Sequence, residues 1–307
     1  MRPEAAPGER EQYISARKIS NIKNQVRSDI RTGFSANGGD VGGLLRRFED
    51  LKRDDPLWDY AFDTNEEGVT TKLWWMNPHQ RSLAYIYGDV IQVDVSEGRN
   101  EYNYHLATFV VVDANNRSRT IGHCVSHHQD TETFTWMFQH LDYHLKKNRF
   151  SVIFTDRDAA MTAAINKVWP RIFHGYCLWH LYKNLNEHLS GRLQSRWHEF
   201  YSQFAGVYRQ GSVRTFEAAV GELLTRWPEC RDYLQNSILP CKESWAWCFV
   251  GMRFVAGIRT TGRVESEHLQ NKNIGLNRGC SLNQLFDLLN RRSEIQQDDS
   301  LVANYAV

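Results

Sequence analysis

The 307-residue sequence lacks any long hydrophobic run. Its longest apolar stretch, residues 106–112, is interrupted by Thr108 and ends at Asp113, whereas a membrane-spanning helix needs about 20 apolar residues. The first residues, MRPEAAPGEREQ, have no apolar core of the kind that a secretory signal contains. We therefore expect no membrane partner.

Net charge is also nearly absent, because 37 Lys and Arg residues are balanced by 36 Asp and Glu residues. A protein that holds nucleic acid by bulk charge carries a basic excess, so any DNA-binding surface here has to be a local basic groove. The six cysteines form no C-x-x-C pair. This pattern favours free thiols in a reducing compartment over a disulfide framework.

Hydrophobic periodicity divides the chain into four regions. Residues 1–82 are predicted to be an N-terminal helical region, with amphipathic helices near 14–31 and 40–54. Residues 83–177 mix strand and helix patterns, and residues 178–258 show helical patterns alone. Residues 259–307 end in a helical pattern from Ser281. We interpret the second and fourth regions as one catalytic core, interrupted by an α-helical insertion.

The core begins with β-branched and aromatic runs that predict strands at residues 85–94, 104–113 and 119–126. Their short connections indicate an antiparallel meander. The pattern then predicts a helix from Asp130 or Thr131, a strand at 151–156, a helix at 158–169 with Asp158 as its N-cap, and a short strand at 172–174. Strands reached through a helix are usually parallel to their neighbours. This order predicts an α/β fold with an RNase H-like mixed sheet of antiparallel and parallel strands.

Two acids close apolar strands of this core, Asp94 after VIQV and Asp156 after VIFT. If these strands are adjacent and parallel, both carboxylates lie at the carboxyl edge of the sheet, where ligands of open α/β sheets bind. Two close carboxylates repel each other unless a cation lies between them, and Mg²⁺ prefers carboxylate and phosphate oxygens. The alternative is that each Asp is merely a strand-end turn residue.

A third carboxylate is available in the segment TTGRVESEH, which contains Glu265 and Glu267. Glu265 is predicted near a helix N-terminus, which favours its ionised form. Glu267 is two residues further on and points about 200° away around the helix. Only one of the two can therefore face the sheet, and the alternative is a solvated acidic turn.

Three blocks of the sequence together resemble the Mutator-like element (MULE) transposases. The blocks are GDVIQVDVSEGRNEYNYHLATFVVVDANNRS, then SVIFTDRDAAMTAAINKVWP with HGYCLWHLYKN, and then TTGRVESEH. They occur in the family's order within residues 84–290. The chain departs from relatives in having Ser96-Glu97 where Thr-Tyr is usual, and no zinc-finger module is recognisable on either side of the core.

The resemblance implies an RNase H-like DDE transposase that cuts and joins DNA. Its catalytic and metal-binding triad would be Asp94, Asp156 and Glu265, holding two Mg²⁺ or Mn²⁺ ions that activate the nucleophile and stabilise the leaving oxygen. The partners would be transposon ends and target DNA, in the nucleus, with homo-oligomers as a further expectation. Two alternatives stay open: a domesticated, non-cutting transcription regulator, as in plant far-red-response regulators, and a general RNase H-like nuclease.

Further residues are assigned supporting roles. Cys177 and His180 form a C-x-x-H motif on one helix face, interpreted as structural because a structural zinc needs four ligands and nothing in the spacing brings His174 or His188 to it. The candidates for DNA backbone contacts are Arg253, Arg259, Arg263, Arg278 and His268.

Overall fold

The computed structural model describes residues 39–96, 100–145, 150–258 and 260–305. The chain divides into two compact units, residues 1–47 and 48–307. Within the first unit the described residues are 39–47, which begin helix α2 (Gly39–Asp54). The helix predicted near 14–31 lies outside the described residues.

Seven strands form one mixed sheet in the order β1-β2-β5-β4-β3-β6-β7. The strands are β1 (Asp59–Thr64), β2 (Thr70–Met76), β3 (Val90–Ser96), β4 (His105–Val112), β5 (Ser118–Ser126), β6 (Val152–Thr155) and β7 (Phe173–Tyr176). Strands β3, β4 and β5 form the predicted antiparallel meander. Strand β6 is parallel to β3, and β7 is parallel to β6. The predicted α/β fold with an RNase H-like mixed sheet is confirmed.

The start of the sheet differs from the prediction. Strands β1 and β2 lie in the region expected to be helical, and β2 pairs with β5. Five consecutive residues of β2, Lys72 to Met76, are buried, so both faces of the strand are covered. The strand therefore lacks the alternation of apolar and polar residues by which the sequence would reveal it. Residues 85–87, expected in a strand, instead end helix α3 (Pro78–Tyr87), which Asn77 and Gln80 begin with a capping box.

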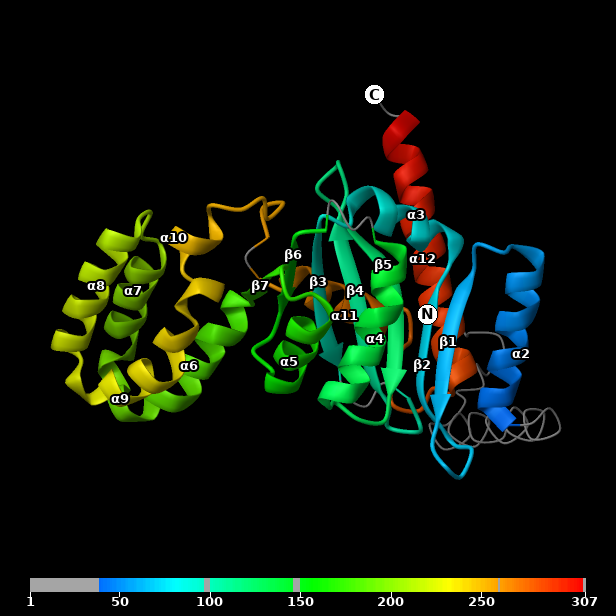
Figure 1. Ribbon diagram of the computed structural model, residues 1–307, viewed down its shortest axis with the longest axis horizontal. Coiled ribbons are helices and arrows are strands. Elements are labelled where there is room, and N and C mark those ends of the chain that lie inside the picture. The colour runs from blue at the N-terminus through cyan, green and yellow to red at the C-terminus, as the bar shows by residue number, and fades with distance from the viewer. Residues whose placement is uncertain (1–38, 97–99, 146–149, 259, 306–307) are drawn as a thin grey trace, which may run out of the picture. The chain divides into compact units, whose positions relative to one another are not determined.

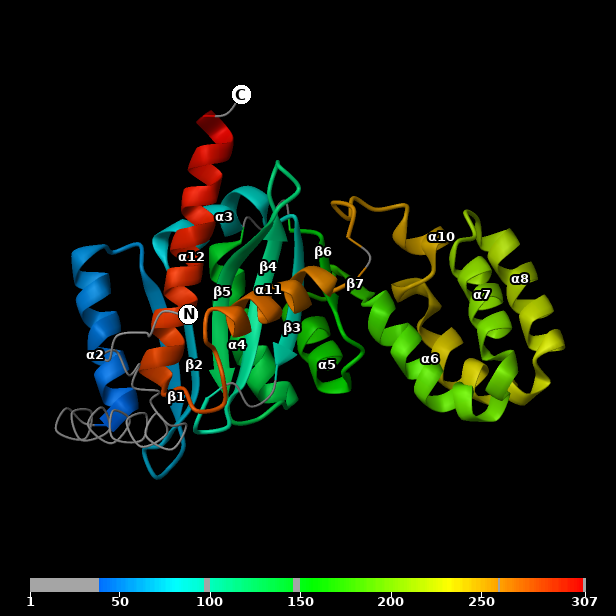
Figure 2. The same cartoon turned by 180° about the vertical axis from the view of Figure 1, so that it is seen from behind.

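Helices cover both faces of the sheet (Figures 1 and 2). One face packs against α3, α4 (Thr131–His144) and α5 (Ala159–Val168) in a large hydrophobic core. Asp130 caps α4 and Asp158 caps α5, as the sequence predicts for Asp158. The other face carries α11 (Gly262–Asn273), which contacts β3, β4 and β5, and α12 (Leu282–Tyr305) follows it.

Gly175 allows β6 and β7 to pack closely. A Cβ atom at this position of β7 would lie 2.4 Å from the ring of Phe154, which is far inside van der Waals contact. The glycine therefore lets the Phe154 ring lie across β7. This packing fixes the strand end that precedes Cys177.

Residues 178–258 contain helices and no strand, as their helical patterns predict, and their interpretation as an insertion into a catalytic core stays a prediction. Its α-helices are α6 (Leu178–Leu193), α7 (Trp197–Tyr208), α8 (Val213–Arg226), α9 (Arg231–Tyr233) and α10 (Trp247–Val250). They enclose a hydrophobic core of their own around Phe200, Trp227 and Trp245. The insertion is therefore stabilised by its own burial of apolar surface.

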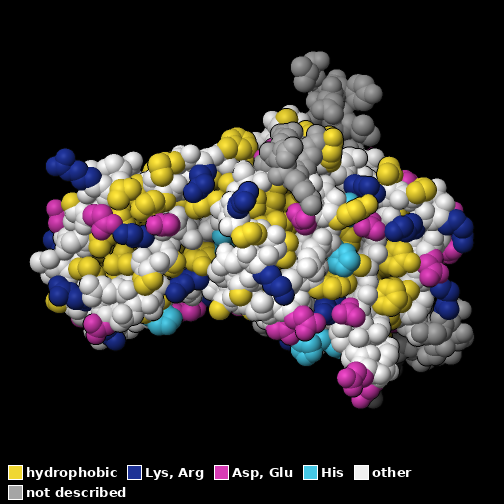
Figure 3. Space-filling model, in the orientation of Figure 1, with side chains coloured by type: hydrophobic (Ala, Val, Ile, Leu, Met, Phe, Trp, Pro, Cys, Tyr) yellow, Lys and Arg dark blue, Asp and Glu magenta, His cyan; other side chains and the backbone are white. Residues whose placement is uncertain are grey.

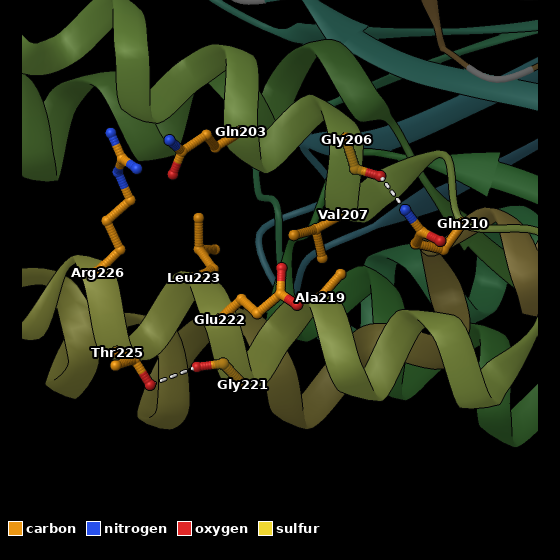
Figure 4. A pocket seen from close by; sticks show the side chains of 10 residues that line it. All are labelled: Gln203, Gly206, Val207, Gln210, Ala219, Gly221, Glu222, Leu223, Thr225 and Arg226. Carbon is orange, nitrogen blue, oxygen red and sulfur yellow. Dashed lines mark hydrogen bonds between the residues drawn. The ribbon is translucent and has the colours of Figure 1, made fainter.

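A groove lies between α7 and α8 of the insertion (Figure 4). Small residues open it, Gly206 on α7 with Ala219 and Gly221 on α8, and Glu222 and Arg226 are its charged lining residues. This lining offers no set of metal-ligating side chains. The chemistry-bearing residues lie instead around the ends of β3, β6 and β7.

In the described part of the chain, no helix has the length and apolar character that a membrane span requires.

Candidate functional site

Asp94 points toward α11. Ile91 and Val93 of β3 belong to the core on the opposite face, and successive side chains of a strand alternate between faces. The side chain of Asp94 is 13% exposed, and its Oδ2 lies 3.3 Å from Nδ1 of His268 on α11. Val95 and Ser96 continue β3 beyond it, so Asp94 lies within the strand and not at its end as predicted.

Asp156 follows the last residue of β6, as the sequence predicts. Strands β3 and β6 pair in parallel with Gln92 opposite Phe154, and two further residues along this register place Asp94 alongside Asp156. Burial, the Asp94 carboxylate and the Asp158 carboxylate raise the pKa of Asp156 to about 6, against the opposing effect of His180. Oδ1 of Asp156 is buried and has no hydrogen-bond partner within the described structure.

The two glutamates of α11 have different environments. Glu265 is half-buried in the first turn of the helix, where its Oε1 lies 3.4 Å from Thr261 Oγ1. Glu267 is buried and accepts from Arg292 Nε and Nη2, both at 3.0 Å, and from Gln296 Nε2 at 2.9 Å. Glu267 therefore links α11 to α12, whereas Glu265 presents a ligand atom within 4.8 Å of ligand atoms of Cys177 and His180.

Cys177 joins the end of β7 to the start of α11. Its sulfur accepts hydrogen bonds from the backbone N–H and the hydroxyl of Thr261, both at 3.1 Å. Burial raises the pKa of the Cys177 thiol, but hydrogen bonds from His180 and Thr261 outweigh burial and hold the pKa below its usual value. Burial lowers the pKa of His180, but its interactions with Cys177, Asp94 and Asp156 outweigh this and raise it.

Neither of the other nearby histidines joins Cys177. His174 Nε2 lies 2.7 Å from Thr155 Oγ1, and His188 Nδ1 lies 2.8 Å from the Asn184 carbonyl. Thr261 is a site residue that the sequence analysis missed. In the sequence, Thr261 could be recognised only as a threonine directly before the helix that carries Glu265. No local sequence pattern connects it to Cys177, which lies 84 residues earlier.

Metal-ligating atoms gather most tightly around Cys177. Within the described ranges, one group of His, Cys, Asp and Glu residues has ligand atoms that all lie within 4.8 Å of one another, namely Cys177, His180 and Glu265. The three carboxylates of the predicted triad do not form such a group. A divalent cation between Asp94 and Asp156 would nevertheless relieve the repulsion between the two carboxylates, and it would give the buried Oδ1 of Asp156 a partner.

The predicted DNA-contacting residues are dispersed. Arg263 donates to the carbonyl and side chain of Asn116 in the β4–β5 turn. The Arg253 guanidinium stacks 4.4 Å from the ring of Phe173 at the start of β7, the end opposite Cys177. His268 contacts Asp94 and is 8% exposed. Arg278 is exposed in the α11–α12 connection, and Arg259 lies outside the described residues. A basic cluster around the third acid is therefore not observed among the described residues.

The face shown in Figure 3 agrees with the balanced composition. Lys and Arg side chains lie scattered among acidic and neutral ones, without a broad basic patch. On this face, bulk charge offers no obvious track for a phosphate backbone.

Comparison with known proteins gives a family match over part of the chain and several curated relatives. Residues 90–184 match the MULE transposase domain. The chain is 24% identical to Protein FAR-RED IMPAIRED RESPONSE 1 of Arabidopsis thaliana over 250 residues, which cover 80% of this chain and 30% of that protein. It is 26% identical to Protein FAR1-RELATED SEQUENCE 5 of Arabidopsis thaliana over 287 residues, which cover 93% of this chain and 36% of that protein.

The chain thus spans about a third of the length of the curated relatives that it matches. The predicted resemblance to MULE transposases is confirmed over a range that includes Asp94, Asp156, Cys177 and His180. Glu265 lies beyond the matched range, and its link to the site is the proximity of its carboxylate to Cys177 and His180.

Proposed function

We propose that this chain, which carries a MULE transposase domain, is the catalytic part of a DDE transposase that hydrolyses DNA phosphodiester bonds and transfers the strands. The observation that carries the proposal is the pair Asp94 and Asp156 on adjacent parallel strands, with an unpartnered buried oxygen on Asp156. Such an arrangement is poorly stable unless a cation shares the charge.

Asp94, Asp156 and Glu265 would hold two Mg²⁺ or Mn²⁺ ions. When bound, such ions polarise the scissile phosphate and activate the attacking hydroxyl or water. The protein residues provide negative charge and positioning. His268 orients the Asp94 carboxylate from α11, and the Thr261–Cys177 contact holds the helix turn that carries Glu265.

The partners and location follow from the same proposal. The substrates would be transposon ends and target DNA, the protein would act in the nucleus, and homo-oligomers would bring two ends together. Support comes from the family match alone.

The first test is a nicking assay on supercoiled DNA. We expect Mg²⁺- or Mn²⁺-dependent nicking that Asp94→Asn, Asp156→Asn and Glu265→Gln each lower by at least about a hundredfold, because each removes charge that the reaction centre needs. Asp158→Asn is the matched control, because asparagine caps a helix as well as aspartate and Asp158 caps α5. Nicking that survives all three substitutions would refute the proposal.

The second candidate is a regulator that binds DNA without cutting it. It is favoured by the relatives, one of which is named for an impaired far-red response. Absence of nicking in the wild type, with DNA binding retained, would select this candidate.

DNA binding by this chain is expected to be weak and tolerant of sequence. A protein without a basic excess that contacts phosphates alone binds with a Kd on the order of 10⁻⁴–10⁻⁶ M at physiological salt. Arg278→Ala, in the exposed α11–α12 connection, should weaken binding to unrelated duplexes equally and reduce the salt slope by about one unit. Arg214→Ala on α8 removes the same charge from the insertion. Equal losses in both variants would show that the α11–α12 connection provides no DNA contact of its own.

A further inference from the structure

Three side chains around the start of α6 have the composition of a zinc site. Cys177, His180 and Glu265 each present a ligand atom, and the three atoms lie within 4.8 Å of one another. Thiolate, imidazole and carboxylate are the ligands that Zn²⁺ uses, and three protein ligands leave a fourth position for water or another oxygen. A thiolate selects Zn²⁺ over Mg²⁺, which prefers oxygen ligands.

Two contacts prepare the sulfur to bind a cation. The N–H and hydroxyl of Thr261 donate to Cys177 Sγ, and Thr261 is the N-cap residue directly before α11. Hydrogen bonds and a helix N-terminus both favour the thiolate form of a cysteine. By donating to the sulfur, Thr261 orients it, as hydrogen-bond partners of the metal-binding side chains do in zinc sites.

The histidine has unused bonding capacity. Nδ1 of His180 is buried and lacks a hydrogen-bond partner in the described part of the chain. A buried polar atom without a partner is unfavourable. Coordination of a metal by the imidazole, with proton release, removes this unfavourable state.

We propose that Cys177, His180 and Glu265 bind one Zn²⁺ ion, with Thr261 supporting the thiolate. The thiolate and the carboxylate balance the charge of the ion. The C-x-x-H motif thereby does more than pack α6 against the sheet. Because Glu265 is shared with the proposed catalytic triad, zinc at this site withdraws Glu265 from Mg²⁺, and this consequence alone depends on the proposed function.

The test uses Co²⁺ as a spectroscopic probe of the full chain. We expect one Co²⁺ per chain with a sulfur-to-cobalt charge-transfer band, displaced by Zn²⁺. Cys177→Ser should abolish the band and weaken Zn²⁺ binding by about a hundredfold or more. Removal of a residue that only hydrogen-bonds to a metal ligand already lowers metal affinity by about 10–100-fold. Thr261→Val should weaken binding by about tenfold. Cys241→Ser is the matched control, because Cys241 is a half-buried cysteine of the insertion.

A measurement on the wild type keeps the proposal testable if Cys177→Ser fails to fold. X-ray absorption of the zinc-loaded protein should show one sulfur at about 2.3 Å together with nitrogen and oxygen ligands. A spectrum without sulfur, or a cobalt band that persists in Cys177→Ser and disappears in Cys241→Ser, would overturn the zinc site. Neither readout requires DNA cutting, so failure of the zinc site and failure of the transposase proposal are distinguishable.

Discussion

Asp156→Asn is expected to stabilise the fold by about 3 kcal/mol at pH 8 and by little at pH 4. Burial and the neighbouring carboxylates raise the pKa of Asp156 from 3.8 to about 6, and this rise corresponds to about 3 kcal/mol. Below pH 3.8 the carboxyl is protonated in both the folded and the unfolded chain, so the ionised form brings no penalty. Between about pH 4 and pH 6 the folded chain retains a proton that the unfolded chain has lost, and stability falls as pH rises.

Denaturant unfolding without divalent metal, at pH 4 and pH 8, measures this effect. Asp158→Asn is the control, because it is the same substitution two residues away and preserves the N-cap of α5. A gain in stability of equal size at both pH values would show that ionisation of the Asp156 carboxyl does not destabilise the fold. Added Mg²⁺ should stabilise the wild type more than Asp156→Asn, because a ligand of the native state stabilises in proportion to its binding.

Glu267→Ala is expected to destabilise the fold by about 3 kcal/mol. The Glu267 carboxylate is 5% exposed and forms a two-pronged ion pair with Arg292, whose side chain is 19% exposed. Removal of one partner leaves the other charge largely buried and uncompensated, which costs about 3–5 kcal/mol. The loss should appear in denaturant unfolding as a lower midpoint.

Two further variants make this measurement specific. Glu187→Ala removes an exposed ion pair with Lys183 at 3.8 Å and should change stability by less than about 1 kcal/mol. The double variant Glu267→Ala/Arg292→Ala should be nearly as stable as Glu267→Ala, because it also removes the Arg292 charge that the single substitution leaves uncompensated. If Glu267→Ala abolished nicking and left stability unchanged, the choice of Glu265 over Glu267 would be wrong.

The sequence alone determined the central part of the fold. Three β-branched runs with short connections gave the antiparallel strands, and the next two strands alternate with helices, which makes them parallel to their neighbours. The N-cap of α5 at Asp158 was also readable, because capping depends on residues only three positions apart. These features depend on local chemistry and periodicity.

Features that depend on burial from both sides were not readable. Strand β2 lacks an alternating pattern because both of its faces are covered, and the residues 85–87 resemble a strand by composition although they end a helix. Propensity yields to tertiary packing at both positions.

For the site, the sequence supplied the residue types and the structure decided their partners. Asp94 and Asp156 were predicted to meet because the carboxyl ends of parallel strands share an edge, and the β3–β6 register agrees. The tertiary structure alone decided that Glu267 pairs with Arg292 on α12, that Arg263 contacts Asn116, and that Thr261 donates to Cys177. Each of these contacts joins segments 25 or more residues apart, a separation at which no local pattern constrains which side chains meet.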